Sequence, residues 1–232
     1  HAAANVEALL LENGFEKLEN LAEGALVPGG SYYTMQNGSA VLAVKIPENP
    51  AKGFRIAASH SDSPCFKIKE VPEMKVENTY VKLNVEKYGG MILSPWLDRP
   101  LSVAGRVFVA GKDGKPEVKL VNLKKDLLII PNVAIHFNRE INNGFTYNPQ
   151  TDMAPLMGLD QELSIKKLCA EAADVAEEEI LGSDLYVYNR DKGSGRFPDR
   201  LSASGRSAMC LCNAARISGI EAGRIYQCVC AV

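Results

Sequence analysis

The stretch Phe54-Arg55-Ile56-Ala57-Ala58-Ser59-His60-Ser61-Asp62 decides the fold class, because a short apolar run leads directly into polar side chains. We expect the run at 54–58 to be a buried strand. Alternate residues of an extended segment point to the same side, so His60 and Asp62 are expected to meet at the end of that strand. Sheets of α/β proteins commonly carry their sites at the C-terminal ends of strands. In an α/β sheet His60 and Asp62 would stand where such proteins place their sites, whereas from the spacing alone a polar turn before Pro64 is the favoured alternative.

The segments around this strand agree with an α/β fold. Residues 5–13 show helical apolar spacing, and residues 31–46 form a predicted hairpin around Asn37-Gly38, a strong turn signal. A second helix is expected at 207–217. Residues 224–232 predict a strand with apolar residues on both faces, which is typical of a central, doubly covered strand.

The middle of the chain has a different character. Residues 76–145 alternate as strands do, and they contain no convincing helix. Helices are expected at 160–173 and 174–180, and a strand follows at 184–188. This order predicts a β-rich unit inserted into the α/β part.

Composition excludes several classes of protein. The chain has 232 residues, 26 Lys and Arg against 28 Asp and Glu, and a net charge of −2, so no basic excess favours nucleic acid or anionic lipid. No apolar run approaches the ~18 residues needed to span a bilayer, and the start does not resemble a signal peptide. The pairs Cys210/Cys212 and Cys228/Cys230 are expected to be buried free thiols rather than a zinc site, which fits a reducing cytoplasm.

Two histidines are candidates for chemistry. A metal-binding His commonly has its second ring nitrogen held by a carboxylate, so Asp62 would orient His60 or bind metal itself. The alternative is a polar turn before Pro64, since His-x-Asp is common by chance. His136 lies in a predicted strand at 132–138 and faces away from its apolar side, so it belongs either to a site or to a solvent-facing surface.

Four segments resemble the aspartyl aminopeptidases, a family of dinuclear zinc exopeptidases that form large homo-oligomers. The likeness rests on both single motifs and their order along the chain. The segments are Ala58–Lys69, Tyr88–Val107 (with Trp96-Leu97-Asp98-Arg99-Pro100), Ile130–Arg139 and Ile141–Phe145, and Asp184–Lys192 is similar to a strand of the family.

The resemblance implies an α/β, zinc-exopeptidase-like catalytic domain at 1–72 and 184–232, interrupted by a β-rich lid or dimerisation domain at 73–183. His60 matches a zinc ligand and Asp62 the carboxylate that orients it. His136 matches a His that a neighbouring subunit lends to the substrate pocket. Asp98 and Arg99 match a structural signature of the β-rich domain, with an ion pair as one arrangement.

The implied activity is removal of N-terminal, acidic residues from peptides by zinc-activated water, with two zinc ions in each complete subunit, in the cytoplasm. The chain departs from the family after Lys192. Residues 204–209 lack the bridging Asp, and the chain ends where the Glu general base would follow. We therefore expect that residues are missing from the sequence between 192 and 208. A distance between consecutive Cα atoms that exceeds the usual value of about 3.80 Å would mark the junction, for which Arg206–Ser207 is the first choice and 193–197 the second. The alternative is a catalytically incompetent module for oligomerisation or binding.

Overall fold

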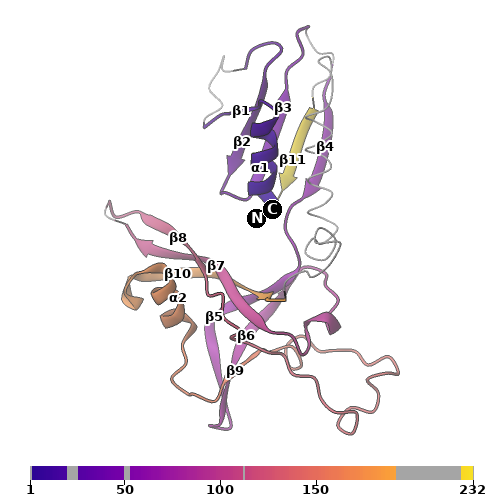
Figure 1. Cartoon of the computed structure of the whole chain (residues 1–232), viewed down its shortest axis with the longest axis vertical. Coiled ribbons are helices and arrows are strands. Elements are labelled where there is room, and N and C mark those ends of the chain that lie inside the picture. Colours follow the sequence, from indigo (N-terminus) through magenta and orange to yellow (C-terminus); the bar gives the residue numbers. More distant parts are fainter. Residues whose placement is uncertain (1, 20–25, 50–52, 112, 192–225, 232) are drawn as a thin grey trace. The chain divides into compact units, whose positions relative to one another are not determined.

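The computed structural model describes residues 2–19, 26–49, 53–111 and 113–191, and the backbone of 226–231. The chain divides into two compact units (Figure 1). Unit 1 comprises residues 1–63 and 193–232, and unit 2 comprises residues 64–192.

Unit 1 contains one described helix and a five-stranded mixed sheet. The helix is α1 (Ala2–Glu12), and the strands are β1 (Glu16–Lys17), β2 (Ser31–Gln36), β3 (Ala40–Lys45), β4 (Arg55–His60) and β11 (Tyr226–Ala231). The sheet order is β1-β2-β3-β11-β4, and β11 runs parallel to β4 and antiparallel to β3. The strand expected at the end of the chain therefore exists and is internal to the sheet.

The predicted hairpin is confirmed, and its turn has a clear cause. Asn37 and Gly38 have φ values of 53° and 68°, and the amide of Ser39 donates to the carbonyl of Gln36. Positive φ at both central residues defines the type I′ turn that suits the twist of two antiparallel strands. Helix α1 then packs Val6 and Leu10 against Tyr33 to form the core of unit 1.

The expectation that residues 54–58 form a fully buried strand is wrong. Strand β4 exists, but Phe54 and Ile56 are 71% and 63% exposed. Among the described residues β4 lies at the sheet edge, and α1 covers the part of the sheet formed by β2 and β3. The α/β class is nevertheless confirmed by the combination of helices and sheets.

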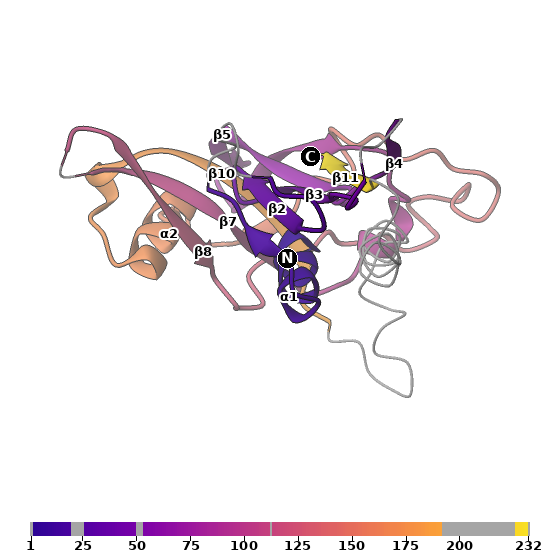
Figure 2. The ribbon, with the colours of Figure 1, turned by 90° about the horizontal axis from the view of Figure 1, so that it is seen from above.

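Unit 2 is built on a six-stranded antiparallel sheet in the order β8-β7-β10-β5-β6-β9. Its elements are β5 (Cys65–Val76), β6 (Tyr80–Tyr88), the 3₁₀ helix η1 (Ser94–Trp96), β7 (Leu101–Ala110), β8 (Pro116–Asn122), β9 (Leu156–Gly158), α2 (Ile165–Ala173), the 3₁₀ helix η2 (Glu177–Glu179) and β10 (Ile180–Asn189). One continuous core lies on one side of this sheet, and α2 lies beside β8 (Figure 2). The inserted unit is therefore β-rich, as its alternating sequence predicts.

Three expectations for this unit differ from the structure. The expected helix at 174–180 is reduced to η2, because Asp174 adopts a left-handed conformation (φ 53°) that ends α2. The expected strand at 132–138 is instead a loop with a turn at residues 135–137. The units divide at 63/64 and 192/193, whereas the boundaries expected at 72/73 and 183/184 fall inside β5 and β10.

Candidate metal and substrate-binding residues

The side chains of His60 and Asp62 form the hydrogen bond that the sequence predicts. His60 Nδ1 lies 2.7 Å from Asp62 Oδ1, and the two side chains are 38% and 26% exposed. In the tautomer that carries its proton on Nδ1, His60 donates a hydrogen bond to the carboxylate, which leaves the Nε2 lone pair available to a metal ion. The arrangement matches the carboxylate–histidine pair that commonly orients a zinc ligand.

Strand β4 places this pair at the edge of the sheet. His60 is its last residue and stands opposite Ala231 of β11 in the parallel register. The Ser61 hydroxyl lies 3.3 Å from the carbonyl oxygen of Ser39, which ties the segment after β4 to the β2–β3 turn. The C-terminal ends of two parallel strands therefore meet where α/β proteins place their sites.

The described residues fit one part of a zinc centre. A zinc site needs three or four protein ligands, and paired sites need a carboxylate that holds both ions. Within the described ranges, no group of three or more His, Cys, Asp or Glu side chains is arranged to hold a metal ion. This part of the chain therefore supplies His60 as one oriented candidate ligand and does not by itself form a dinuclear centre.

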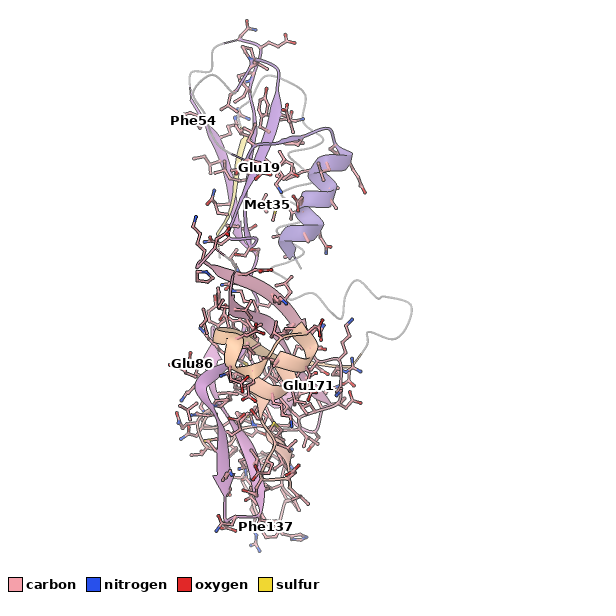
Figure 3. The ribbon with its side chains drawn as sticks, turned by 90° about the vertical axis from the view of Figure 1, so that its left-hand side faces the viewer. Glu19, Met35, Phe54, Glu86, Phe137 and Glu171 are labelled. Atoms are coloured by element: carbon pink, nitrogen blue, oxygen red, sulfur yellow. The ribbon has the colours of Figure 1, made fainter. Side chains whose placement is uncertain are left out.

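His136 lies in unit 2, on the loop between Pro131 and Pro155, and it is exposed. Its apolar neighbours Val133, Ile135 and Phe137 are 53%, 47% and 85% exposed, so they form no buried strand face. Phe137 projects from one end of the unit, well away from α2 (Figure 3). The surroundings of His136 are thus an exposed apolar loop, and its separation from His60 within one subunit stays a prediction.

Asp98 anchors the start of this loop, a role that sequence reasoning missed. Its Oδ1 accepts a hydrogen bond of 2.8 Å from the amide of Asn132, and its own amide donates to the carbonyl of Ile130 at 2.9 Å. Asp98 has φ 55°, a conformation that Asp and Asn tolerate better than most residues. The signal available in the sequence was the short side chain of Asp98, a hydrogen-bond acceptor, directly before Arg99-Pro100. Asp and Pro are common in turns.

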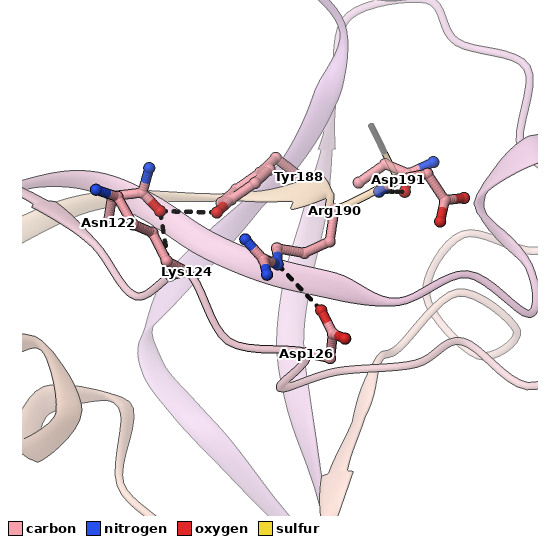
Figure 4. A network of polar contacts seen from close by, with 7 residues as sticks. Asn122, Lys124, Asp126, Tyr188, Arg190 and Asp191 are labelled. Carbon is pink, nitrogen blue, oxygen red and sulfur yellow. Dashed lines mark hydrogen bonds and ion pairs between the residues drawn. The ribbon is translucent and has the colours of Figure 1, made fainter. Parts of the chain in front are cut away.

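The end of β10 is tied by polar contacts to the end of β8 and to the segment that follows β8 (Figure 4). Arg190 Nε donates to Asp126 Oδ1 at 3.0 Å, and the Tyr188 hydroxyl donates to Asn122 Oδ1 at 2.7 Å. Arg99 forms an ion pair of 2.7 Å with Asp191 rather than with Asp98. The expected Asp98–Arg99 ion pair is therefore absent, and each residue instead fixes a different segment.

Replacing Asp98 with alanine should lower the free energy of unfolding of unit 2 by about 2 kcal/mol. Alanine cannot form the charge-assisted hydrogen bond to the Asn132 amide. It also lacks the side-chain oxygen that lets Asp tolerate the left-handed conformation. Asp98→Asn keeps an acceptor and tolerates this conformation, so its loss should stay below about 0.5 kcal/mol. Urea unfolding followed by fluorescence measures both variants, and equal losses would show that the Asn132 contact contributes nothing.

A charged cluster lies on strands β5, β7 and β10 of unit 2. Asp184 on β10 lies 3.4 Å from Lys67 Nζ and 3.1 Å from Arg106 Nη2. Burial raises the pKa of Asp184, but hydrogen bonds from Tyr186, Lys67 and Arg106 outweigh burial, so this pKa falls below its ordinary value. Burial and the Asp184 contact raise the pKa of Tyr186 to about 12, so the phenol remains protonated and donates.

The lowered pKa of Asp184 predicts a pH dependence of stability. A carboxyl group with a depressed folded pKa stabilises the fold above its unfolded pKa, near 3.8, and loses this contribution as the pH falls through the folded pKa. Asp184→Asn should therefore be less stable than the wild type at pH 7, with the difference shrinking below about pH 4. Urea unfolding from pH 2 to 7 tests this, with Asp113→Asn in the exposed β7–β8 turn as the control. A pH-independent difference would contradict the assignment.

Comparison with known proteins identifies the family. The model of the family "Aminopeptidase I zinc metalloprotease (M18)" matches residues 1–206. The chain belongs to this family, which confirms the resemblance at the level of the family. A probable M18 family aminopeptidase 2 of Clostridium acetobutylicum is 44% identical over 201 residues, covering 83% of this chain and 46% of the relative. A probable M18 family aminopeptidase 2 of Pseudomonas entomophila is 38% identical over 192 residues, covering 81% of this chain and 44% of the relative.

Solved structures show the same fold. The cryo-EM structure of the Ape4 and Nbr1 complex contains a chain with TM-score 0.82 and 27% identity, covering 99% of this chain and 50% of that one. The Chaetomium thermophilum mApe1 structure has TM-score 0.77 and 25% identity, covering 99% and 58%. The chain spans about half the length of the curated relatives it matches.

Several predictions lie outside the described residues. They concern the helix at 207–217, the burial of the two Cys-x-Cys pairs, and the Cα spacing from 192 to 209. The family match ends at residue 206, beside the junction expected at Arg206–Ser207. In the described part of the chain no helix is long and apolar enough to cross a bilayer.

Proposed function

We propose that this chain is the portion of a metal-dependent, cytoplasmic aminopeptidase that carries one zinc ligand and one substrate-binding residue. The observation that supports the proposal is the 2.7 Å contact between His60 Nδ1 and Asp62 Oδ1 at the end of β4, in a chain of a zinc metalloprotease family. His60 would bind zinc through Nε2. When bound, zinc supplies an activated water for attack on the peptide carbonyl.

Each residue of the site has a separate role in this proposal. Asp62 holds the His60 ring in one tautomer and orientation, and it raises the basicity of Nε2. His136, on its exposed loop, would enter the substrate pocket of a neighbouring subunit in a homo-oligomer and donate a hydrogen bond to the oxyanion of the tetrahedral intermediate. Acidic N-terminal residues of peptides are the proposed substrates.

Zinc binding and peptide hydrolysis by the complete subunit, of which this chain is the proposed portion, test the proposal. Zinc is titrated by calorimetry, and release of the first residue is followed for tetrapeptides that begin with Asp, Glu, Ala or Leu. Asp62→Asn should weaken zinc binding by about 10–100-fold. His136→Ala should leave zinc binding unchanged and lower the rate of hydrolysis by about 10²–10³-fold, the usual effect of losing one oxyanion donor.

A matched control is Asp113→Asn, which makes the same chemical change on an exposed turn. Circular dichroism confirms that each variant is folded. Zinc affinity in Asp62→Asn equal to that of the wild type would contradict the orienting role. A folded oligomer that neither binds zinc nor releases amino acids would contradict the enzyme proposal and support the alternative, an oligomerisation or binding module.

A further inference from the structure

A cavity opens in unit 2 where two neighbouring strands of the sheet part. Strands β5 and β10 pair only at Phe66↔Val187 and Lys67↔Tyr186. Beyond this point β10 continues along β7 back to Ile180, while β5 follows β6 with a register shift between Ile68 and Glu73. In Figure 1 the two strands run in different directions, with α2 nearby. We call the space between β5 residues 68–73 and β10 residues 180–185 the β5–β10 slot.

The slot exposes one edge of β10. Ile180 and residues 182–185 pair with β7 on one side, with an irregularity at Leu181, and no strand in the described part of the chain pairs with residues 180–185 on the other side. The Ile180 amide donates to the Glu177 carbonyl at the end of η2, and no backbone–backbone hydrogen bond from a described loop closes the edge at residues 181–185. Unpaired strand edges are the sites at which a further strand adds to a sheet.

The cavity has a volume of about 720 Å³, which falls within the range of ligand and peptide clefts. Its floor consists of apolar or uncharged side chains that are less than a tenth exposed. They are Ile68, Val107, Ile165, Cys169, Ile180 and Leu185. Burial raises the pKa of the Cys169 thiol to about 11, so this group remains neutral at physiological pH. The floor is therefore uncharged, and its side chains expose only a little apolar surface to the cavity.

The rim of the cavity carries charges of both signs. Lys69 and Lys166 face it together with Glu70, Glu86 and Glu177. Glu73 is already engaged, because its Oε1 accepts a hydrogen bond of 2.7 Å from the Ile165 amide at the start of α2. A peptide with charges of one sign would meet like charges on this rim, whereas a peptide of low net charge can pair with both.

We propose that the β5–β10 slot binds an extended peptide segment of a partner protein as an additional strand, antiparallel to β10 residues 180–185. Main-chain hydrogen bonds to the open edge would supply affinity, and alternate apolar side chains would contact the floor. Six residues of β10 are about 20 Å long, which fits a segment of six or seven residues. The fitting sequence alternates apolar residues with polar residues of both charges, and the proposal does not depend on peptidase activity.

A designed peptide tests the proposal on the whole chain. The probe is a fluorescent heptapeptide of sequence Thr-Val-Lys-Val-Glu-Val-Thr, and binding is measured by fluorescence anisotropy. Two control peptides carry N-methyl groups, one peptide on its odd-numbered residues and the other on its even-numbered residues. One of the two therefore lacks the N–H groups that would face β10. We expect saturable binding of the probe, at least about tenfold weaker binding of one methylated peptide, and slower hydrogen exchange at residues 180–185 on binding.

A variant pair locates the site. Ser183 is exposed and lines the slot, so Ser183→Trp should fill it and weaken probe binding by at least about tenfold. Ser94→Trp, at an exposed position outside the slot, should bind as the wild type does. Equal binding of all three peptides, unchanged binding by Ser183→Trp, or absence of binding would overturn the proposal. So would a self-associated chain whose residues 180–185 are protected without peptide, because a second copy would then occupy the slot.

Discussion

Replacing Phe66 with alanine is expected to lower the free energy of unfolding of unit 2 by about 4 kcal/mol. Phe66 is 0% exposed on β5 and packs edge-to-face on Trp96, with ring centroids 5.1 Å apart. Truncation removes buried apolar area and leaves a cavity, and losses of roughly 3–5 kcal/mol are usual for buried Phe→Ala changes. The edge-to-face contact adds to this loss.

Urea unfolding followed by tryptophan fluorescence measures this effect. Trp96 is the only tryptophan of the chain and lies in unit 2, so its emission reports that unit. Phe137→Ala is the matched control, because Phe137 is 85% exposed and the chemical change is the same. The control should change stability by less than about 0.5 kcal/mol. A loss of under 1 kcal/mol for Phe66→Ala would show that the Phe66–Trp96 contact is not part of the core.

The Phe66–Trp96 contact also links the core of unit 2 to the candidate substrate-binding loop. Trp96 ends η1 and is followed closely by Asp98, whose carboxylate accepts from the Asn132 amide. Loosening Trp96 should therefore loosen the anchor of the loop that carries His136. The segment Trp96–Pro100 therefore connects the core, through Trp96, to the start of the loop, through Asp98.

Local patterns predicted the elements whose causes are local. The β2–β3 hairpin depends on Asn37-Gly38, and two adjacent residues suffice to specify that turn. The pairing of His60 with Asp62 likewise depends on a separation of two residues in an extended segment. Both features could be predicted because the deciding interactions join neighbours in sequence.

Features that depend on distant residues were not predictable in this way. The alternation of Val133, Ile135 and Phe137 suggests a half-buried strand, yet none of the strands described for unit 2 pairs with these residues, and they form an exposed loop. The partner of Asp98 is 34 positions away, and that of Arg99 is 92 positions away. The proposed role of His136 came from the family resemblance, since its own surroundings favour no single interpretation.

Gly105 on β7 shows how closely two strands approach in unit 2. It stands opposite Leu185 in the β7–β10 register. A Cβ atom at this position would lie 2.2 Å from the Asp184 carbonyl oxygen and 2.9 Å from Leu185 Cα. Both are main-chain atoms of a central strand, so neither can turn away as a flexible side chain would.

Gly105→Ala is therefore expected to lower the free energy of unfolding of unit 2 by about 3 kcal/mol, at the upper end of overpacking effects. The strands must separate locally, which also disturbs the Arg106–Asp184 ion pair next to the contact. Gly182→Ala is the control on the partner strand, because a Cβ there would meet no atom within 4 Å. Trp96 fluorescence in urea compares the two variants. Equal stabilities would mean that β7 and β10 can separate at Gly105 without cost, and the close approach would then have no part in holding the sheet together.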